Sequence, residues 1–193
     1  IKTKHNTYLK AGAGFGDYVD VDKIWYTKPI GDNVTTYLGP RIENYYMHGT
    51  TPSVYKGVLK AFALGGNGAA YGASTKAGAG WAYKADNGFA VSSNVVTGNN
   101  GLLTNQQATS WATQVGYTQP QYSASLMINQ KYNGWEDGYY STTKGHYRLL
   151  DGSTSTQQSA NSTNYGLRGW WRPAETGTAT PSVSAGYDVS NID

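Results

Sequence analysis

The chain has 193 residues, enough for a domain with a sizeable core, and no shift in composition suggests a second domain. Its 25 glycines, 17 tyrosines and 6 tryptophans, against 3 phenylalanines, are typical of a β-protein whose surface meets both oil and water. A net charge of +3 with scattered lysine and arginine argues against a nucleic-acid partner, and the absence of cysteine excludes disulfide scaffolds, thiolate metal sites and cysteine nucleophiles. No run of about 18 apolar residues occurs, which excludes a transmembrane helix but not a barrel whose strands are apolar on alternate positions.

The N-terminal part of the chain predicts a β-hairpin. Candidate strands, rich in β-forming residues, are Lys2–Lys10, Asp17–Lys28 and Val34–Met47. The segment from Pro29 to Asn33 predicts the short turn. In the third strand, alternation predicts one face made of Val34, Thr36, Leu38 and Ile42, and an opposite face made of Tyr37, Arg41, Glu43 and Tyr45.

A long connection, Gly39–Ser74, then predicts the one helix of the chain, Thr51–Leu64. Thr51 and Pro52 match an N-cap followed by proline at the first helical position, and Gly65-Gly66 supplies a stop. Apolar side chains recur at helical spacing between these ends. A single helix in a long loop of a β-protein suggests an element that covers or narrows something.

The rest of the chain predicts three further hairpins. Their strands are Ala77–Ala85 with Phe89–Val96, Thr109–Thr118 with Gln121–Tyr132, and Thr163–Arg172 with Pro181–Ser190. The Asn87-Gly88 turn of the first is the strongest local hairpin signal. Long polar segments, Gly98–Gln107 and Asn133–Ser162, separate the hairpins.

The connections alternate between short and long from Asp17 onward. Transmembrane barrels sort their loops in this way, with short periplasmic turns and long extracellular loops, and their strands alternate apolar residues towards lipid with polar residues towards water. The sequence therefore predicts an all-β, antiparallel, up-and-down transmembrane β-barrel with one short helix in a long extracellular loop. A soluble β-sandwich is the alternative, because it also has a polar face.

Two stretches resemble a known family. GPRIENYYM, followed by LGGNGAAYGAS and LLTNQ, and later YGLRGWWRPAETGTATPSVSAGYD, are similar to the major outer-membrane porins of cyanobacteria, relatives of the OprB-type carbohydrate porins. The resemblance implies passive diffusion of small hydrophilic solutes and inorganic ions, sugars or iron species among them, across the outer membrane. Its implied partners are outer-membrane lipid and these solutes, and it leaves a homotrimer open.

The chain departs from that family in its extent. Members carry an N-terminal S-layer-homology domain, absent here, and a barrel of about sixteen strands. The present sequence predicts about nine strands. We therefore expect residues 1–193 to form a partial barrel, an internal segment of a porin.

The charged residues expected to line the pore fall into three groups. Arg41 and Glu43 precede the long connection, where the alternative is a pair that only balances charge. Lys56 and Lys60 lie on the predicted helix and face either the lumen or the extracellular solvent. By strand alternation, the remaining lumen-facing residues are Lys131, Arg168, Arg172 and Asp188.

Enzyme activity is not expected. The histidines, His5, His48 and His146, are far apart, which makes a metal site improbable, and the chain has no G-x-S-x-G motif or phosphate-binding loop. No cofactor is predicted. The main rival function is a secreted, β-rich carbohydrate-binding protein whose aromatic loops, with Trp135 and Tyr139 among them, stack on sugars.

Overall fold

The structure is a computed structural model. It describes residues 7–10, 20–54, 75–98, 108–133, 135, 146–148, 154–156, 161–174 and 180–192. Within these ranges the chain is all-β, and the only regular helix is a single 3-10 turn, η1 (Asn44–Met47). In the described part of the chain, no helix is long and apolar enough to cross a bilayer.

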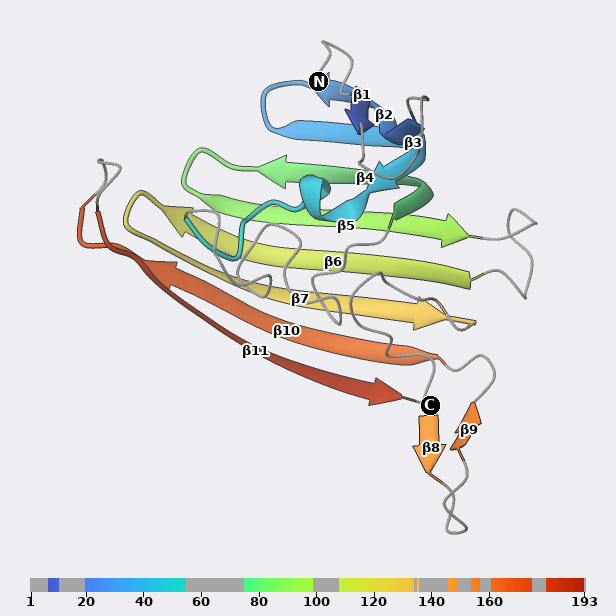
Figure 1. Ribbon diagram of the computed structural model, residues 1–193. Helices are drawn as coiled ribbons and strands as arrows, with labels where there is room; N and C mark the ends of the chain where they lie inside the picture. Colours follow the sequence, from blue (N-terminus) through green and yellow to red (C-terminus); the bar gives the residue numbers. More distant parts are fainter. Residues whose placement is uncertain are drawn as a thin grey trace.

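Most strands belong to one nine-stranded antiparallel sheet (Figure 1). Each strand of this sheet pairs with the strands that precede and follow it along the chain, apart from one small hairpin that forms a two-stranded sheet of its own. In sheet order these strands are β1 (Thr7–Lys10), β2 (Asp20–Ile30), β3 (Val34–Glu43), β4 (Thr75–Lys84), β5 (Phe89–Gly98), β6 (Ala108–Gln119), β7 (Tyr122–Tyr132), β10 (Ser162–Trp171) and β11 (Val183–Ile192). β1 and β11 lie at opposite edges, so the sheet is open. The up-and-down topology predicted from the sequence is confirmed.

A separate small sheet lies in the segment between β7 and β10. Its strands, β8 (His146–Arg148) and β9 (Thr154–Thr156), pair antiparallel. Sequence analysis predicts only a polar loop over Asn133–Ser162, so this hairpin is an addition. Its strands are too short to show a clear period of two.

The predicted turn at Asn87-Gly88 joins β4 to β5 as expected. Gly88 has a φ of +94°, which glycine adopts without a steric penalty. The Asn87 side chain accepts a 3.0 Å hydrogen bond from the Phe89 backbone N–H, and Ala85 N–H donates to Phe89 C=O at 2.8 Å. These bonds close the turn and set the register in which Lys84 pairs with Ala90.

The predicted faces of the third strand are wrong beyond Gly39. The register of β3 with β4 shifts between Gly39 and Ile42, which marks a β-bulge. Because one extra residue moves Ile42 to the face opposite Leu38, Ile42 is 0% exposed whereas Leu38 is 65% exposed. Ile42 joins Trp25, Met47 and Val96 in an apolar cluster.

The predicted helix Thr51–Leu64 is not confirmed. Residues 51–54 are not helical, and the remainder lies outside the described residues. The Thr51 hydroxyl, expected to cap the helix, instead donates to the Ser53 carbonyl at 3.1 Å. Residues 44–54 form a segment that we call the strap; it starts at η1 and lies over β4, β5 and β6 on one side of the sheet (Figure 1).

We expect alanine at Gly88 to lower the free energy of unfolding by more than alanine at Gly31. Both positions have positive φ, which costs an L-residue about 1–2 kcal/mol. The new Cβ would also collide with the Thr118 carbonyl oxygen at Gly88, whereas nothing lies within 4 Å at Gly31. Urea titration followed by tryptophan fluorescence measures both losses, and equal losses would show that the turn does not pack against β6.

Candidate functional site

The two faces of the sheet differ in polarity: the buried face is polar and the exposed face is apolar, the reverse of a soluble protein with an apolar core. We call the face whose side chains are buried the inner face. From β5 to β10 its polar residues, each at most 7% exposed, are Ser92, Asn94, Ser110, Gln114, Ser123, Ser125, Asn129, Lys131, Ser162, Asn164 and Arg168. The inner face is therefore mainly a polar surface.

The opposite, outer face is apolar and exposed. From β4 to β11 its large side chains are between 36% and 67% exposed; they are Trp81, Tyr83, Phe89, Trp111, Val115, Tyr117, Tyr122, Leu126, Ile128, Tyr165, Leu167, Trp171, Val183, Tyr187 and Val189. On β5, β6, β7, β10 and β11 the outer face carries no charged residue. The charged residues of these strands, Lys131, Arg168 and Asp188, follow the inner-face alternation.

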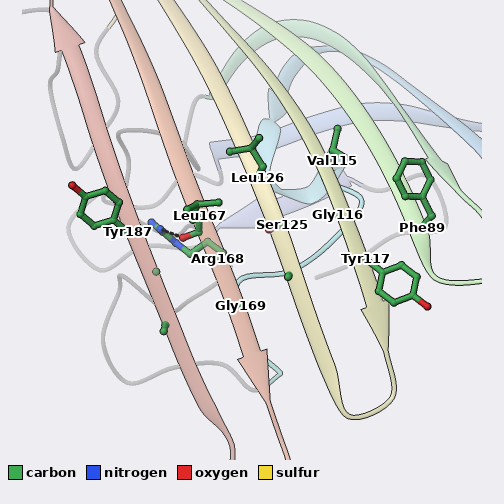
Figure 2. Close-up of a pocket in the computed structure, with 13 residues that line it drawn as sticks. Phe89, Val115, Gly116, Tyr117, Ser125, Leu126, Leu167, Arg168, Gly169 and Tyr187 are labelled. Atoms are coloured by element: carbon green, nitrogen blue, oxygen red, sulfur yellow. Dashed lines mark hydrogen bonds between the residues drawn. The ribbon is translucent and has the colours of Figure 1, made fainter.

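A hollow of about 630 Å³ crosses the outer face over β6, β7, β10 and β11. A cross-strand row of small residues, Ala124, Gly169 and Ala185, forms its floor. Larger side chains flank this row, and Figure 2 shows Tyr117, Leu126, Leu167 and Tyr187 among them. The hollow is lined by carbon for the most part, so it suits hydrocarbon and not a polar solute.

Hydrogen bonds hold the strap against the inner face. The Thr50 backbone N–H donates to Gln114 Oε1 at 2.9 Å, and Gln114 Nε2 donates back to the Thr50 carbonyl at 3.3 Å. The Gly49 N–H donates to Ser92 Oγ at 3.1 Å. Since buried backbone groups must find partners, the polar residues of β5 and β6 supply the hydrogen bonds that the strap lacks.

Glycine lets the strap approach closely. A Cβ at Gly116 would collide with the Thr50 side chain, and a Cβ at Gly49 would crowd Ala90. The same cross-strand row continues from Gly116 through Ser125 to Arg168. Because neighbouring strands lie about 4.8 Å apart, Gly116, which Thr50 contacts, and Arg168 lie roughly 10 Å apart across two strand spacings.

Arg168 and Asp188 form the buried ion pair of this face. Arg168 Nη2 donates to Asp188 Oδ2 at 2.6 Å, and the two side chains are 3% and 9% exposed. Arg168 also donates to its neighbour, the Leu167 carbonyl, at 2.8 Å. A Cβ at Gly186 would overlap the guanidinium, so this glycine lets Arg168 lie flat over β11 towards Asp188.

Asparagines line a second cross-strand row, in which Asn94, Ala112, Asn129 and Asn164 are successive partners. Asn164 Nδ2 donates to the Asn129 carbonyl at 3.0 Å, but Asn94 Oδ1 and Asn164 Oδ1 accept no hydrogen bond from protein. An unpaired buried amide oxygen costs about 1–3 kcal/mol. These oxygens therefore mark places where water or a polar solute is expected to bind.

An aromatic and charged cluster stands at the other end of the sheet. Lys23 pairs with Glu43 and lies 5.9 and 5.6 Å from the ring centroids of Tyr45 and Tyr46. Trp25 stacks on Tyr46 at 5.6 Å. Burial, the hydrogen bond with Tyr46 and the nearby Glu43 carboxylate raise the pKa of Tyr45 well above its usual value. The cluster fixes the start of the strap to β2.

The structure brings together some of the charged residues predicted to line a pore. Lys131 is 0% exposed on the inner face, Arg168 pairs with Asp188, and Arg172 lies over the inner-face ring of Trp170. Tyr165, Leu167 and Trp171 are exposed on the outer face, as their alternation with the arginines predicts.

The remaining predicted residues lie elsewhere. Arg41 is exposed and pairs with Ile24 in the ladder, whereas Glu43 is buried against Lys23. Strands β4 to β7 separate Glu43 from Arg168. Lys56 and Lys60, on the predicted helix, lie outside the described residues.

The functional residues not predicted from the sequence are the polar side chains beneath the strap and the cation Lys23. Gln114, Ser92 and Asn94 alternate with outer-face residues in their strands, so the period of two contains the signal for their side. Lys23 lies two residues before the buried Trp25, so the same alternation indicates its side of the sheet. Nothing local indicates that Gln114 binds the strap, because the two are joined only by the fold.

Comparison with known proteins adds no relative: no family model, curated protein or solved structure matches the chain. The described residues do not gather three or more metal-ligating side chains at any one place. The function must therefore be argued from the faces of the sheet.

We expect Gln114→Leu to release the strap. Leucine cannot replace either hydrogen bond, so Thr50 loses the partners of its buried N–H and carbonyl groups at a cost of about 1–3 kcal/mol. Amide hydrogen exchange at Gly49 and Thr50 should speed up, while exchange in β5 and β6 stays slow. The matched control is Gln130→Leu on the outer face; if both variants left exchange at Thr50 unchanged, the strap would not depend on Gln114.

Proposed function

We propose that the chain forms part of the wall of an outer-membrane porin, through which small hydrophilic solutes and inorganic ions diffuse passively. In this proposal the outer face contacts lipid and the inner face lines the water-filled lumen. Further strands at the edges of β1 and β11 would close the open sheet into a barrel.

One observation carries the proposal: over β5, β6, β7, β10 and β11 every charged residue is on the inner face and the exposed outer face is apolar. In water, a contiguous apolar face of this extent would be costly to leave exposed. In a bilayer it is the stable arrangement, since a charge on the lipid side costs about 2–4 kcal/mol at the midplane.

Polar groups on the outer face also behave as hydrocarbon requires. Trp111 Nε1 donates to Ser93 Oγ at 2.9 Å, and Ser93 Oγ shares a 3.0 Å hydrogen bond with Thr113 Oγ1. These groups therefore satisfy one another without water. Near the short turns, the outer face carries Tyr83, Phe89, Tyr117, Tyr122 and Trp171, a composition typical of an aromatic belt at a membrane interface.

The inner face supplies the expected selectivity. The strap narrows the space over β5 and β6, and the Arg168–Asp188 pair stands across the same row on β10 and β11. With Lys131 also on the inner face, this wall is positive overall, which favours anions mildly. Transport here needs no covalent chemistry; the bore and the fixed charges decide what passes.

Adjacent tryptophans on β10 test which face meets lipid. We expect a variant that keeps only Trp171 to lose most of its fluorescence in vesicles of brominated phospholipid, because the ring is 53% exposed on the outer face. A variant that keeps only Trp170, which is 9% exposed on the inner face, should lose little. The other tryptophans become phenylalanine in both variants.

The two outcomes against the proposal are distinct. Equal quenching of the two variants would show that the sheet does not separate lipid from lumen. A chain that stays monomeric in buffer without detergent, with neither ring quenched, would favour the secreted carbohydrate-binding protein instead.

Selectivity should follow the buried ion pair. We expect Asp188→Asn to raise the anion-to-cation permeability ratio, because it leaves the Arg168 charge unbalanced, and Arg168→Gln to lower the ratio. The measurement is the reversal potential in a potassium chloride gradient across a planar bilayer. The double variant Arg168→Gln/Asp188→Asn is the control and should lie near wild type; unchanged ratios in all three would remove this pair from the pore wall.

A further inference from the structure

Two side chains at the short-turn end of the inner face keep hydrogen-bond donors that the fold does not use. Trp170 is 9% exposed, and its indole N–H has no hydrogen-bond partner in the part of the chain that the structure describes. The Arg172 guanidinium lies 5.9 Å from the centroid of the Trp170 ring. A buried N–H without an acceptor is rare in native proteins, so it needs an explanation.

Arg172 keeps part of its donor capacity free. Its Nε donates to the Pro120 carbonyl at 2.7 Å, which fixes the guanidinium against the β6–β7 turn. No carboxylate of the described residues pairs with it. Because a guanidinium has five N–H donors, its terminal nitrogens remain able to bind an oxyanion with two parallel hydrogen bonds.

Hydroxyl groups surround these donors. In the ladder, Ser123 of β7 and Ser184 of β11 are the direct partners of Trp170, so their Cβ atoms lie within about 5.5 Å of its own. Ser123 shares a 2.9 Å hydrogen bond with Thr118. A serine hydroxyl can donate to an anion while it accepts from a neighbour.

The surroundings of Trp170 and Arg172 carry positive charge. The nearest described carboxylate on these strands, Asp188, is opposite Gly166, which puts its backbone about 13 Å from that of Trp170 along the strand. Its Oδ2 is already bound by Arg168 at 2.6 Å. Among the described residues a metal cation would therefore find no free carboxylate here, whereas an anion would find donors and positive charge.

We propose that Trp170 and Arg172, with Ser123 and Ser184, form a binding site for small oxyanions such as inorganic phosphate. The site deepens the proposed pore function, on which its role in transport rests, by naming a substrate class. It lies beside the short turns, one inner-face row beyond the row of Gly116 and Arg168, so it is a second position on the inner face at which solutes would be selected.

The test titrates inorganic phosphate into the full chain in detergent micelles and follows the indole N–H resonances of ¹⁵N-labelled tryptophan. The Trp170 resonance should shift and saturate, while the Trp171 resonance, from the outer face, should not move. Arg172→Gln should weaken binding by about tenfold, since it removes charge-assisted hydrogen bonds, and Arg172→Lys should restore most of the affinity.

A second variant separates the indole N–H from the ring. Trp170→Phe keeps an aromatic ring under Arg172 but has no N–H, and isothermal titration calorimetry should show phosphate bound more weakly by about three- to tenfold. Equal affinity in wild type, Arg172→Gln and Trp170→Phe would overturn the site. So would a Trp170 resonance that moves no more than that of Trp171.

Conductance recordings test the proposed pore function separately from the phosphate site. Normal conductance without phosphate binding would reject the site and leave the pore standing. Saturable binding by this chain, with no conductance when further strands complete the barrel, would reject the pore and leave an oxyanion site in a protein of another kind.

Discussion

The antiparallel hydrogen-bond ladder is the constraint on which the rest of this structure depends. Pairing from β4 to β11 runs almost without interruption, so alternate side chains are held on opposite faces across the whole sheet. Every polar residue of the inner face and every apolar residue of the outer face owes its position to this register. A slip by one residue would place Arg168 on the apolar side.

The strap shows how the polar face organises the irregular part of the chain. Its backbone N–H groups donate to Ser92 and Gln114, and the Thr50 carbonyl accepts from Gln114, where a soluble protein would have apolar packing. A loop placed on such a surface is held by direction-specific bonds and close glycine contacts, with an apolar cluster around Ile42 and Met47 only at its start. Its position on the sheet is therefore set by a few named donors and acceptors.

Much of the sheet could be predicted from the sequence, and the reason is local. The alternation of side chains and the Asn-Gly turn signal each depend on only a few neighbouring residues. Strand positions, and the common face of Arg168 and Trp170, therefore follow from spacing in the sequence. The bulge before Ile42 could not be predicted, because one extra residue leaves the strand composition unchanged and reverses only its faces. The strap is non-local: its hydrogen bonds join residues 43 and 64 positions apart, so no pattern within a few residues predicts them.

The alternation has a consequence for the chain before it folds. In the extended sequence polar residues interrupt the apolar side chains of β7, as Ser123 and Ser125 do on either side of Ala124. The longest apolar run of this strand, Leu126 to Ile128, is three residues, so no long apolar stretch is displayed. The apolar surface comes into being only when strands pair and bring Leu126, Leu167 and Tyr187 side by side. The same sequence is therefore compatible with water while the chain is extended and with hydrocarbon once it has folded. Strand pairing is the step that changes one into the other.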